Sequence, residues 1–258
     1  MAFMKASDGA EIYYETGGDG VPVILIAGLA SDHRHWYKGV RYLEGYRIVS
    51  LDNRGCGQTK YEGEFDIGRM AADVAELSDE LGLGPAHVIG WSMGSHIAID
   101  LASRYPDKVR SLCLVGSYVH RPARSGYILG ALGYGYLDGK VSPDMFGAVL
   151  NTLLRPESWF RYMETSGKKI CVSEMPSPEM VKDQLMAVSG YDAEEDLKKI
   201  RVPVLSVHGL DDIMTEPSCG DEVAATLGDC EVLRLPGEGH IVSQDKYFPR
   251  YREFIDSH

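Results

Sequence analysis

The stretch Ala86-His87-Val88-Ile89-Gly90-Trp91-Ser92-Met93-Gly94-Ser95-His96-Ile97-Ala98-Ile99-Asp100-Leu101-Ala102 decides how this chain folds. Its short apolar run at 87–89 is typical of a buried strand, and its later apolar residues have the spacing of a helix face. Between them lies the pattern G-x-S-x-G. A strand that turns directly into a helix leaves no room for side chains two residues before and after the turn, so Gly90 and Gly94 are needed there. The pattern predicts that Ser92 stands on a strained turn above a sheet, beside the first N–H groups of a helix.

The rest of the chain alternates between strand and helix patterns. Apolar runs predict strands at 21–27, 46–51, 109–115, 202–207 and 231–235, and an edge strand at 12–14. Helices are expected at 67–81 after an Asp66 cap, at about 218–227 and at about 246–255. Strands that alternate with helices predict an α/β fold, in which helices cover both faces of a mostly parallel central sheet.

Residues 117–196 interrupt this alternation. We expect only helical stretches there, broken by glycine and proline and rich in tyrosine and methionine. The segment leaves one strand and returns to the next, so it should lie over the carboxyl ends of the strands, where open α/β sheets bind ligands. We therefore predict a core of 1–116 and 197–258 and a helical lid of 117–196, inserted after the strand at 109–115. Alternatively, the large side chains of this segment simply form a small core of the lid itself.

Composition and charge narrow the function classes. A formal net charge of −12 argues against nucleic acid or an anionic membrane as a partner. No apolar stretch approaches the ~20 residues of a membrane span. The first five residues, Met1-Ala2-Phe3-Met4-Lys5, run directly into polar residues and give no sign of a signal peptide. We therefore expect a small-molecule substrate, no membrane and no nucleic acid, and leave the oligomeric state open.

The cysteines and the absence of ligand motifs add two further expectations. The chain has five scattered cysteines without C-x-x-C spacing, which indicates reduced thiols and a cytoplasmic location. They are Cys56, Cys113, Cys171, Cys219 and Cys230. No phosphate-binding loop or metal-ligand pattern is present in the sequence, so we expect neither a cofactor nor a metal.

Two segments near the C-terminus can supply the partners of a nucleophilic serine. A serine hydroxyl becomes a good nucleophile only when a base takes its proton, and that base needs an acid to orient it. His240 is the best base, because it lies in a glycine-rich loop directly after the strand at 231–235. The loop after the preceding strand offers the acid, either Asp212 or Asp211. The order serine, aspartate, histidine is the one associated with G-x-S-x-G.

In these motifs the chain resembles the α/β-hydrolase family over most of its length outside the lid. The matching motifs occur in the family's order: Gly28-Leu29, Asp52-x-Arg54-Gly55-x-Gly57, Gly90-x-Ser92-x-Gly94, Tyr105-Pro106-Asp107-x-Val109, Gly209-x-x-Asp212 and Gly239-His240. The stretch 32–36 is similar to members of the 3-oxoadipate enol-lactonase type. Many other members have histidine before the first glycine, where this chain has Ala27.

The resemblance implies a cofactor-free serine hydrolase that cleaves a carboxylic ester or lactone of a small, largely apolar molecule through an acyl-enzyme. It also implies Asp212 as the acid and the backbone N–H groups of Leu29 and Met93 as the oxyanion hole. Trp91 and Tyr118 are the expected substrate-binding residues, although Trp91 could equally be a packing residue. Carbon–carbon bond hydrolysis, cofactor-free perhydrolysis and a slow-turnover ligand receptor remain alternatives, because the shape of the lid decides the substrate.

Overall fold

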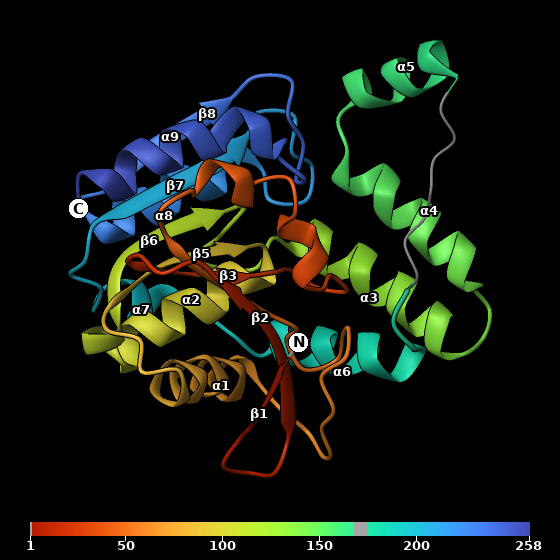
Figure 1. Ribbon diagram of the computed structural model, residues 1–258. Helices are drawn as coiled ribbons and strands as arrows, with labels where there is room; N and C mark the ends of the chain where they lie inside the picture. Colours follow the sequence, from red (N-terminus) through yellow and green to blue (C-terminus); the bar gives the residue numbers. More distant parts are fainter. Residues whose placement is uncertain (1, 168–174) are drawn as a thin grey trace.

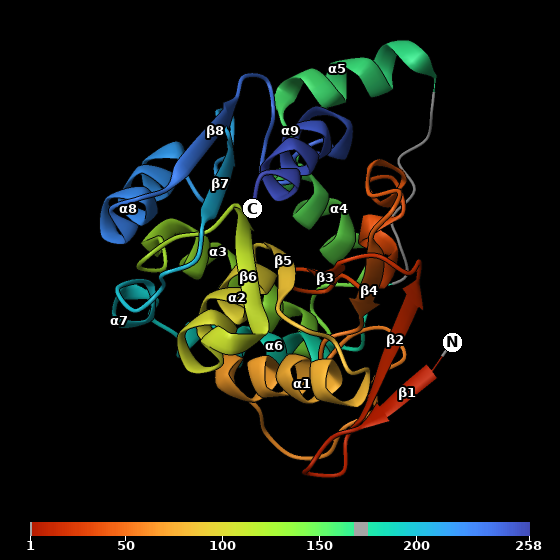
Figure 2. The same ribbon diagram turned by 60° about the vertical axis from the view of Figure 1, so that its left-hand side comes forward.

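A computed structural model of the chain describes residues 2–167 and 175–258, and its centre is a single sheet (Figures 1 and 2). The strand order across this sheet is β1-β2-β4-β3-β5-β6-β7-β8. The bounds are β1 (Ala2–Lys5), β2 (Glu11–Gly17), β3 (Pro22–Ile26), β4 (Arg47–Leu51), β5 (Ala86–Trp91), β6 (Val109–Val115), β7 (Val204–Gly209) and β8 (Glu231–Leu235). All pairs from β4 to β8 are parallel, whereas β2 pairs antiparallel with both β1 and β4. The predicted mostly parallel α/β sheet is therefore confirmed.

The position of the strand predicted at 12–14 was wrong. This strand, β2, lies between β1 and β4, and β1 takes the edge. A tight turn joins the two strands, with Ala6 N–H donating to Ala10 O and Gly9 at a φ of 94°. The sequence gives little sign of β1, because it has four residues and buries only Met4.

Helices cover both faces of the sheet, as predicted. Their bounds are α1 (Ile67–Glu80), α2 (Met93–Arg104), α3 (Ala123–Leu137), α4 (Pro143–Leu154), α5 (Glu157–Ser166), α6 (Pro178–Ser189), α7 (Glu194–Leu197), α8 (Pro217–Leu227) and α9 (Gln244–Asp256), with short 3-10 helices η1 (His33–Trp36), η2 (Val40–Tyr42) and η3 (Pro106–Lys108). On one face, α1, α2 and α8 contribute to the core that contains Ile24 and Val88. On the other, α9 and η1 cover Leu25 and Ile89. Side chains on both faces of β3 and β5 are buried, so β3 is apolar throughout and β5 is apolar apart from His87.

The segment between β6 and β7 is helical in the residues that the structure describes. Helices α3, α4, α5 and α6 gather on one side of the molecule, at the right in Figure 1. A small apolar cluster, in which Tyr136 stacks on Phe146, holds α3 and α4 together. Ala187 and Leu197, near the end of the segment, belong instead to the core beneath the sheet. The division into core and lid stays a prediction. Cys171 lies outside the described residues.

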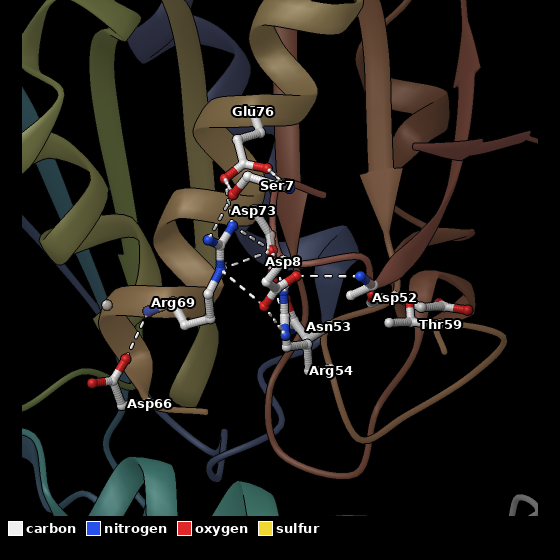
Figure 3. Close-up of polar contacts among 12 residues, drawn as sticks. Ser7, Asp8, Asp52, Asn53, Arg54, Thr59, Asp66, Arg69, Asp73 and Glu76 are labelled. Carbon is white, nitrogen blue, oxygen red and sulfur yellow. Dashed lines mark hydrogen bonds and ion pairs between the residues drawn. The ribbon is translucent and has the colours of Figure 1, made fainter. Parts of the chain in front are cut away.

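A buried ion-pair network joins the N-terminal hairpin to α1 (Figure 3). The Arg54 guanidinium, which is 1% exposed, pairs with Asp73 of α1 at 2.7 Å and with Asp8 of the β1–β2 turn at 2.8 Å. Arg69 pairs with the same Asp73 and with Glu76. Arg54 follows β4, so the network fixes the loop after that strand against the hairpin and the helix.

No helix in residues 2–167 and 175–258 has the length and apolar character that crossing a membrane would require.

Candidate active site

The turn from β5 into α2 places Ser92 above the sheet. Ser92 has φ 54° and ψ −119°, a strained left-handed conformation for a residue with a side chain. Gly90 and Gly94, on either side of Ser92, are required because backbone carbonyl oxygens lie close to both. A Cβ on Gly90 would overlap the carbonyl oxygen of Gly94, and a Cβ on Gly94 would overlap the carbonyl oxygen of Ile26 in β3. The packing of β5, α2 and β3 therefore produces the strained turn that the G-x-S-x-G pattern predicts.

The structure brings Ser92, His240 and Asp212 into one hydrogen-bonded line. Ser92 Oγ lies 2.9 Å from His240 Nε2, and His240 Nδ1 lies 2.8 Å from Asp212 Oδ2. A carboxylate can only accept, so Nδ1 carries the proton and Nε2 is free to accept from the serine hydroxyl. His240 and Asp212 are each 3% exposed. Asp211, the alternative acid, is exposed and takes no part in this line.

The loop that follows Asp212 surrounds its carboxylate with donors. Oδ1 accepts from the backbone N–H groups of Met214 (2.7 Å) and Thr215 (3.0 Å), and Oδ2 accepts from the Thr215 hydroxyl (2.7 Å). Burial acts to raise the pKa of the Asp212 carboxyl, but nearby His240 and these hydrogen bonds lower it by more, so the pKa lies below its ordinary value. Asp212 is therefore ionised and fixed in position.

Sequence reasoning missed Thr215. Its Oγ1 lies 2.7 Å from Asp212 Oδ2 and 3.1 Å from His240 Nδ1, so it touches both partners of the serine. The available signal is a threonine three residues after the acid, the spacing at which a side chain can fold back on a turn. That spacing is common in loops and does not by itself mark a site.

The two predicted oxyanion donors also lie at this site. Met93 is the first residue of α2, where a backbone N–H has no acceptor within the helix, and Leu29 follows the end of β3. In the described residues neither N–H has a hydrogen-bond acceptor. Both residues line the same cavity as Ser92. Gly28 allows the loop before Leu29 to lie close to Trp91, because a Cβ at this position would lie 2.8 Å from the Trp91 indole.

A narrow apolar cavity of about 60 Å³, the catalytic pocket, lies over Ser92. Both predicted substrate-binding residues, Trp91 and Tyr118, line it. The segment 117–196 supplies most of the remaining apolar wall through Leu129, Leu150, Leu154, Leu185 and Val188. Trp91 also has a structural contact, since its Nε1 donates to His240 O at 2.9 Å. Trp91 therefore both packs against the histidine loop and lines the pocket.

Two histidines that precede the site differ in their surroundings. His33 is buried, and its Nδ1 lies 2.7 Å from Asp52 Oδ1, so it stabilises the loop after β4. The His35 ring stacks on Trp91, with centroids 4.3 Å apart and planes 5° apart. Burial lowers the pKa of His35 to about 3, and the positive charge of Arg155 adds to this effect. His35 is therefore a neutral packing partner of the pocket wall at neutral pH.

Two groups of side chains in the described residues are close enough together to hold a metal ion. One is Asp32, His33 and Asp52, and the other is His120, Asp192 and Glu194. The first already contains the His33–Asp52 hydrogen bond, and the second is largely exposed. Neither includes a residue of the line from Ser92 to Asp212.

Comparison with known proteins agrees with this fold. The family model described as alpha/beta hydrolase fold matches residues 21–142. The chain is 28% identical over 249 residues to the pimeloyl-(acyl-carrier protein) methyl ester esterase of Neisseria meningitidis serogroup B, across 91% of this chain and 92% of that protein. Two solved structures share the fold. The enol-lactonase from Burkholderia xenovorans LB400 is 19% identical with a TM-score of 0.82, and the bromoperoxidase from Bacillus anthracis is 22% identical with a TM-score of 0.79; each comparison covers 99% of this chain and 97% of the other.

The chain has the alpha/beta hydrolase fold, as its motifs predict. Its relatives include a protein named as a methyl ester esterase, which supports hydrolase activity in general terms.

Proposed function

We propose that this protein is a serine hydrolase that cleaves a carboxylic ester or lactone through an acyl-enzyme. The observation that carries the proposal is the buried line Ser92 Oγ–His240 Nε2 and His240 Nδ1–Asp212 Oδ2, at 2.9 and 2.8 Å, beneath an apolar pocket. These distances are those at which a base can take the proton of a hydroxyl while an acid holds the base.

In the first half of the reaction, Ser92 Oγ attacks the ester carbonyl carbon while His240 Nε2 takes the hydroxyl proton. The carbonyl oxygen becomes an oxyanion and accepts hydrogen bonds from the N–H groups of Leu29 and Met93. Asp212 stabilises the imidazolium that forms. The tetrahedral intermediate then expels the alcohol, which takes the proton from His240, and the acyl group stays on Ser92.

In the second half, His240 takes a proton from a water molecule that attacks the acyl carbon. The new tetrahedral intermediate collapses, the acid product leaves, and the proton returns to Ser92 Oγ. The narrow apolar walls of the catalytic pocket favour a small, largely apolar group beside the reacting carbonyl.

The test is hydrolysis of short p-nitrophenyl esters by the wild type, Ser92→Ala and Ser218→Ala, an exposed serine of α8 as control. Removing the nucleophile should lower kcat by about 10⁴ or more, and the control should match the wild type. A fluorophosphonate should label the wild type at Ser92 and leave Ser92→Ala unmodified. Turnover that survives in Ser92→Ala would rule out the proposal.

The alternatives use the same three side chains and are separated by substrate. Steady multiple turnover of esters or lactones would distinguish an enzyme from a slow-turnover ligand receptor. Parallel assays with carbon–carbon ring-cleavage products, and with peroxide in place of water, address the other two reactions. The small-molecule partner and the cytoplasmic location remain part of the proposal.

A further inference from the structure

Arg155, at the end of α4, is a half-buried cation that has no carboxylate partner among the described residues. Its Nε is shielded from solvent and has no hydrogen-bond partner there. The guanidinium carbon lies over the Trp159 ring, 4.8 Å from its centroid. A guanidinium stays protonated in such surroundings, and a desolvated charge without a partner is unfavourable. An anion supplied by a ligand would satisfy this side chain.

Among the described residues, the neighbouring acids already have partners of their own. Glu238 accepts from the Ser243 N–H at 2.7 Å and pairs with Lys246 at 2.5 Å. Asp32 pairs with Arg34, and Asp245 pairs with Arg41. Arg155 is thus left without a carboxylate partner in the part of the chain that the structure describes, and it lines a cavity.

The cavity beside Arg155, which we call the outer cavity, has a volume of about 510 Å³, within the usual range for ligand sites. It shares the walls Leu29, Trp91, Leu150 and Leu154 with the catalytic pocket over Ser92. A substrate whose ester reaches Ser92 can therefore extend its remaining part past these walls toward Arg155.

Arg155 is held in a fixed relation to the histidine loop. The N–H of Ile241, the residue after His240, donates to Leu154 O at 2.9 Å. Gly239 packs so closely on the backbone that a Cβ there would lie 2.9 Å from Leu154 O and from Pro156 N. The backbone around Arg155 is therefore held against the same loop that carries the base.

We propose that Arg155 binds a carboxylate of the substrate, so that the enzyme acts on esters that carry a second, free carboxylate. This proposal rests on the proposed ester hydrolysis. The planar guanidinium can bind a carboxylate through two parallel hydrogen bonds, which also fixes the orientation of the substrate.

The test compares the monomethyl and dimethyl esters of succinic, adipic and suberic acids. For each acid, the monoester has a free carboxylate where the diester has a second methyl ester. The readout is the ratio of kcat/KM for monoester and diester, with free methanol as the product measured. The wild type should favour one of the monoesters, and Arg155→Met should lower that ratio about ten-fold or more, mainly through KM. Arg155→Lys should restore part of it. Lys38→Met, which removes an exposed cation of the same cavity, should keep the wild-type ratio.

A wild type that hydrolyses both esters equally well, or an unchanged ratio in Arg155→Met, would overturn the inference and leave ester hydrolysis intact. A ratio that falls in Arg121→Met instead would assign the carboxylate to the cation that lines the catalytic pocket. If Arg155→Met does not fold, adipate should still inhibit hydrolysis of p-nitrophenyl butyrate competitively in the wild type and more weakly in Arg155→Lys. Equal inhibition of both would contradict the proposal. Failure of every ester as a substrate would count against the proposed function itself.

Discussion

At the scale of single residues, the site combines side chains of two kinds. Ser92 and His240 occur in motifs whose chemistry requires those residue types, so they can be predicted from the sequence. Thr215 and Arg155 cannot, because their importance depends on distances to atoms far away in the chain. Arg155 in particular has no acid partner within residues 2–167 and 175–258, and no sequence pattern indicates that a partner is missing.

Thr215 offers a prediction at this scale. Thr215→Val removes the hydroxyl that donates to Asp212 and contacts His240 Nδ1. A hydrogen bond to a buried carboxylate contributes about 1.5 kcal/mol or more, so kcat/KM for a short ester should fall roughly ten-fold. Thr215→Ser keeps the hydroxyl and should retain most of the activity. Equal loss in both variants would show that the methyl group matters and the hydroxyl does not.

At the scale of elements, the strand–turn–helix unit of β5 and α2 is the part most fully predicted. Gly94 is needed because the end of β3 lies against it, and Gly90 is needed because the start of α2 lies against it. Both close contacts involve backbone atoms that cannot move aside. The two strands at the N-terminus were harder. A four-residue strand with one buried side chain carries almost no periodicity, so the sequence does not predict β1 and leaves β2 as the apparent edge strand.

Gly94→Ala tests the close approach of α2 to β3. The added methyl group would overlap Ile26 O, so we expect a loss of several kcal/mol of stability, on the order of that caused by overpacking a core, together with loss of ester hydrolysis. Gly84→Ala is the matched control, because nothing lies within 4 Å of a Cβ at that position. Urea unfolding of both variants measures the difference. Similar midpoints for the two would contradict the packing argument.

At the scale of the whole molecule, charge pairing cannot be derived from the net charge of −12. The sequence suggests only that acids outnumber bases. The structure shows that Arg54 is nevertheless buried between Asp8 and Asp73, which links three segments distant in sequence (Figure 3). The hydrogen bond from Arg54 lowers the pKa of Asp8 to about 2 from an ordinary 3.8, against a smaller opposing effect of burial.

This shift predicts part of the acid sensitivity of the protein. A depressed carboxyl pKa stabilises the folded state above the unfolded pKa, and that contribution is lost as the pH falls from about 4 to about 2. Asp8→Asn should therefore be less stable at pH 7 and lose stability less steeply across that interval. Asp19→Asn, at an exposed aspartate, is the control. Chemical unfolding at several acidic pH values provides the measurement, and parallel curves for wild type and Asp8→Asn would refute the prediction.

The hydrogen bond from the N–H of Ile241 to Leu154 O also has a consequence for protein engineering. Substrate selectivity could be transferred by replacing residues 117–196 with the helices of a relative. This exchange would replace the acceptor, Leu154 O, and keep the donor, the N–H of Ile241. A chimera that receives those helices alone would lose close packing between the stretch from Gly239 to Ile241 and the end of α4. The 117–196 helices and the stretch from Gly239 to Ile241 should therefore be exchanged together, with the recombination breakpoints outside both segments.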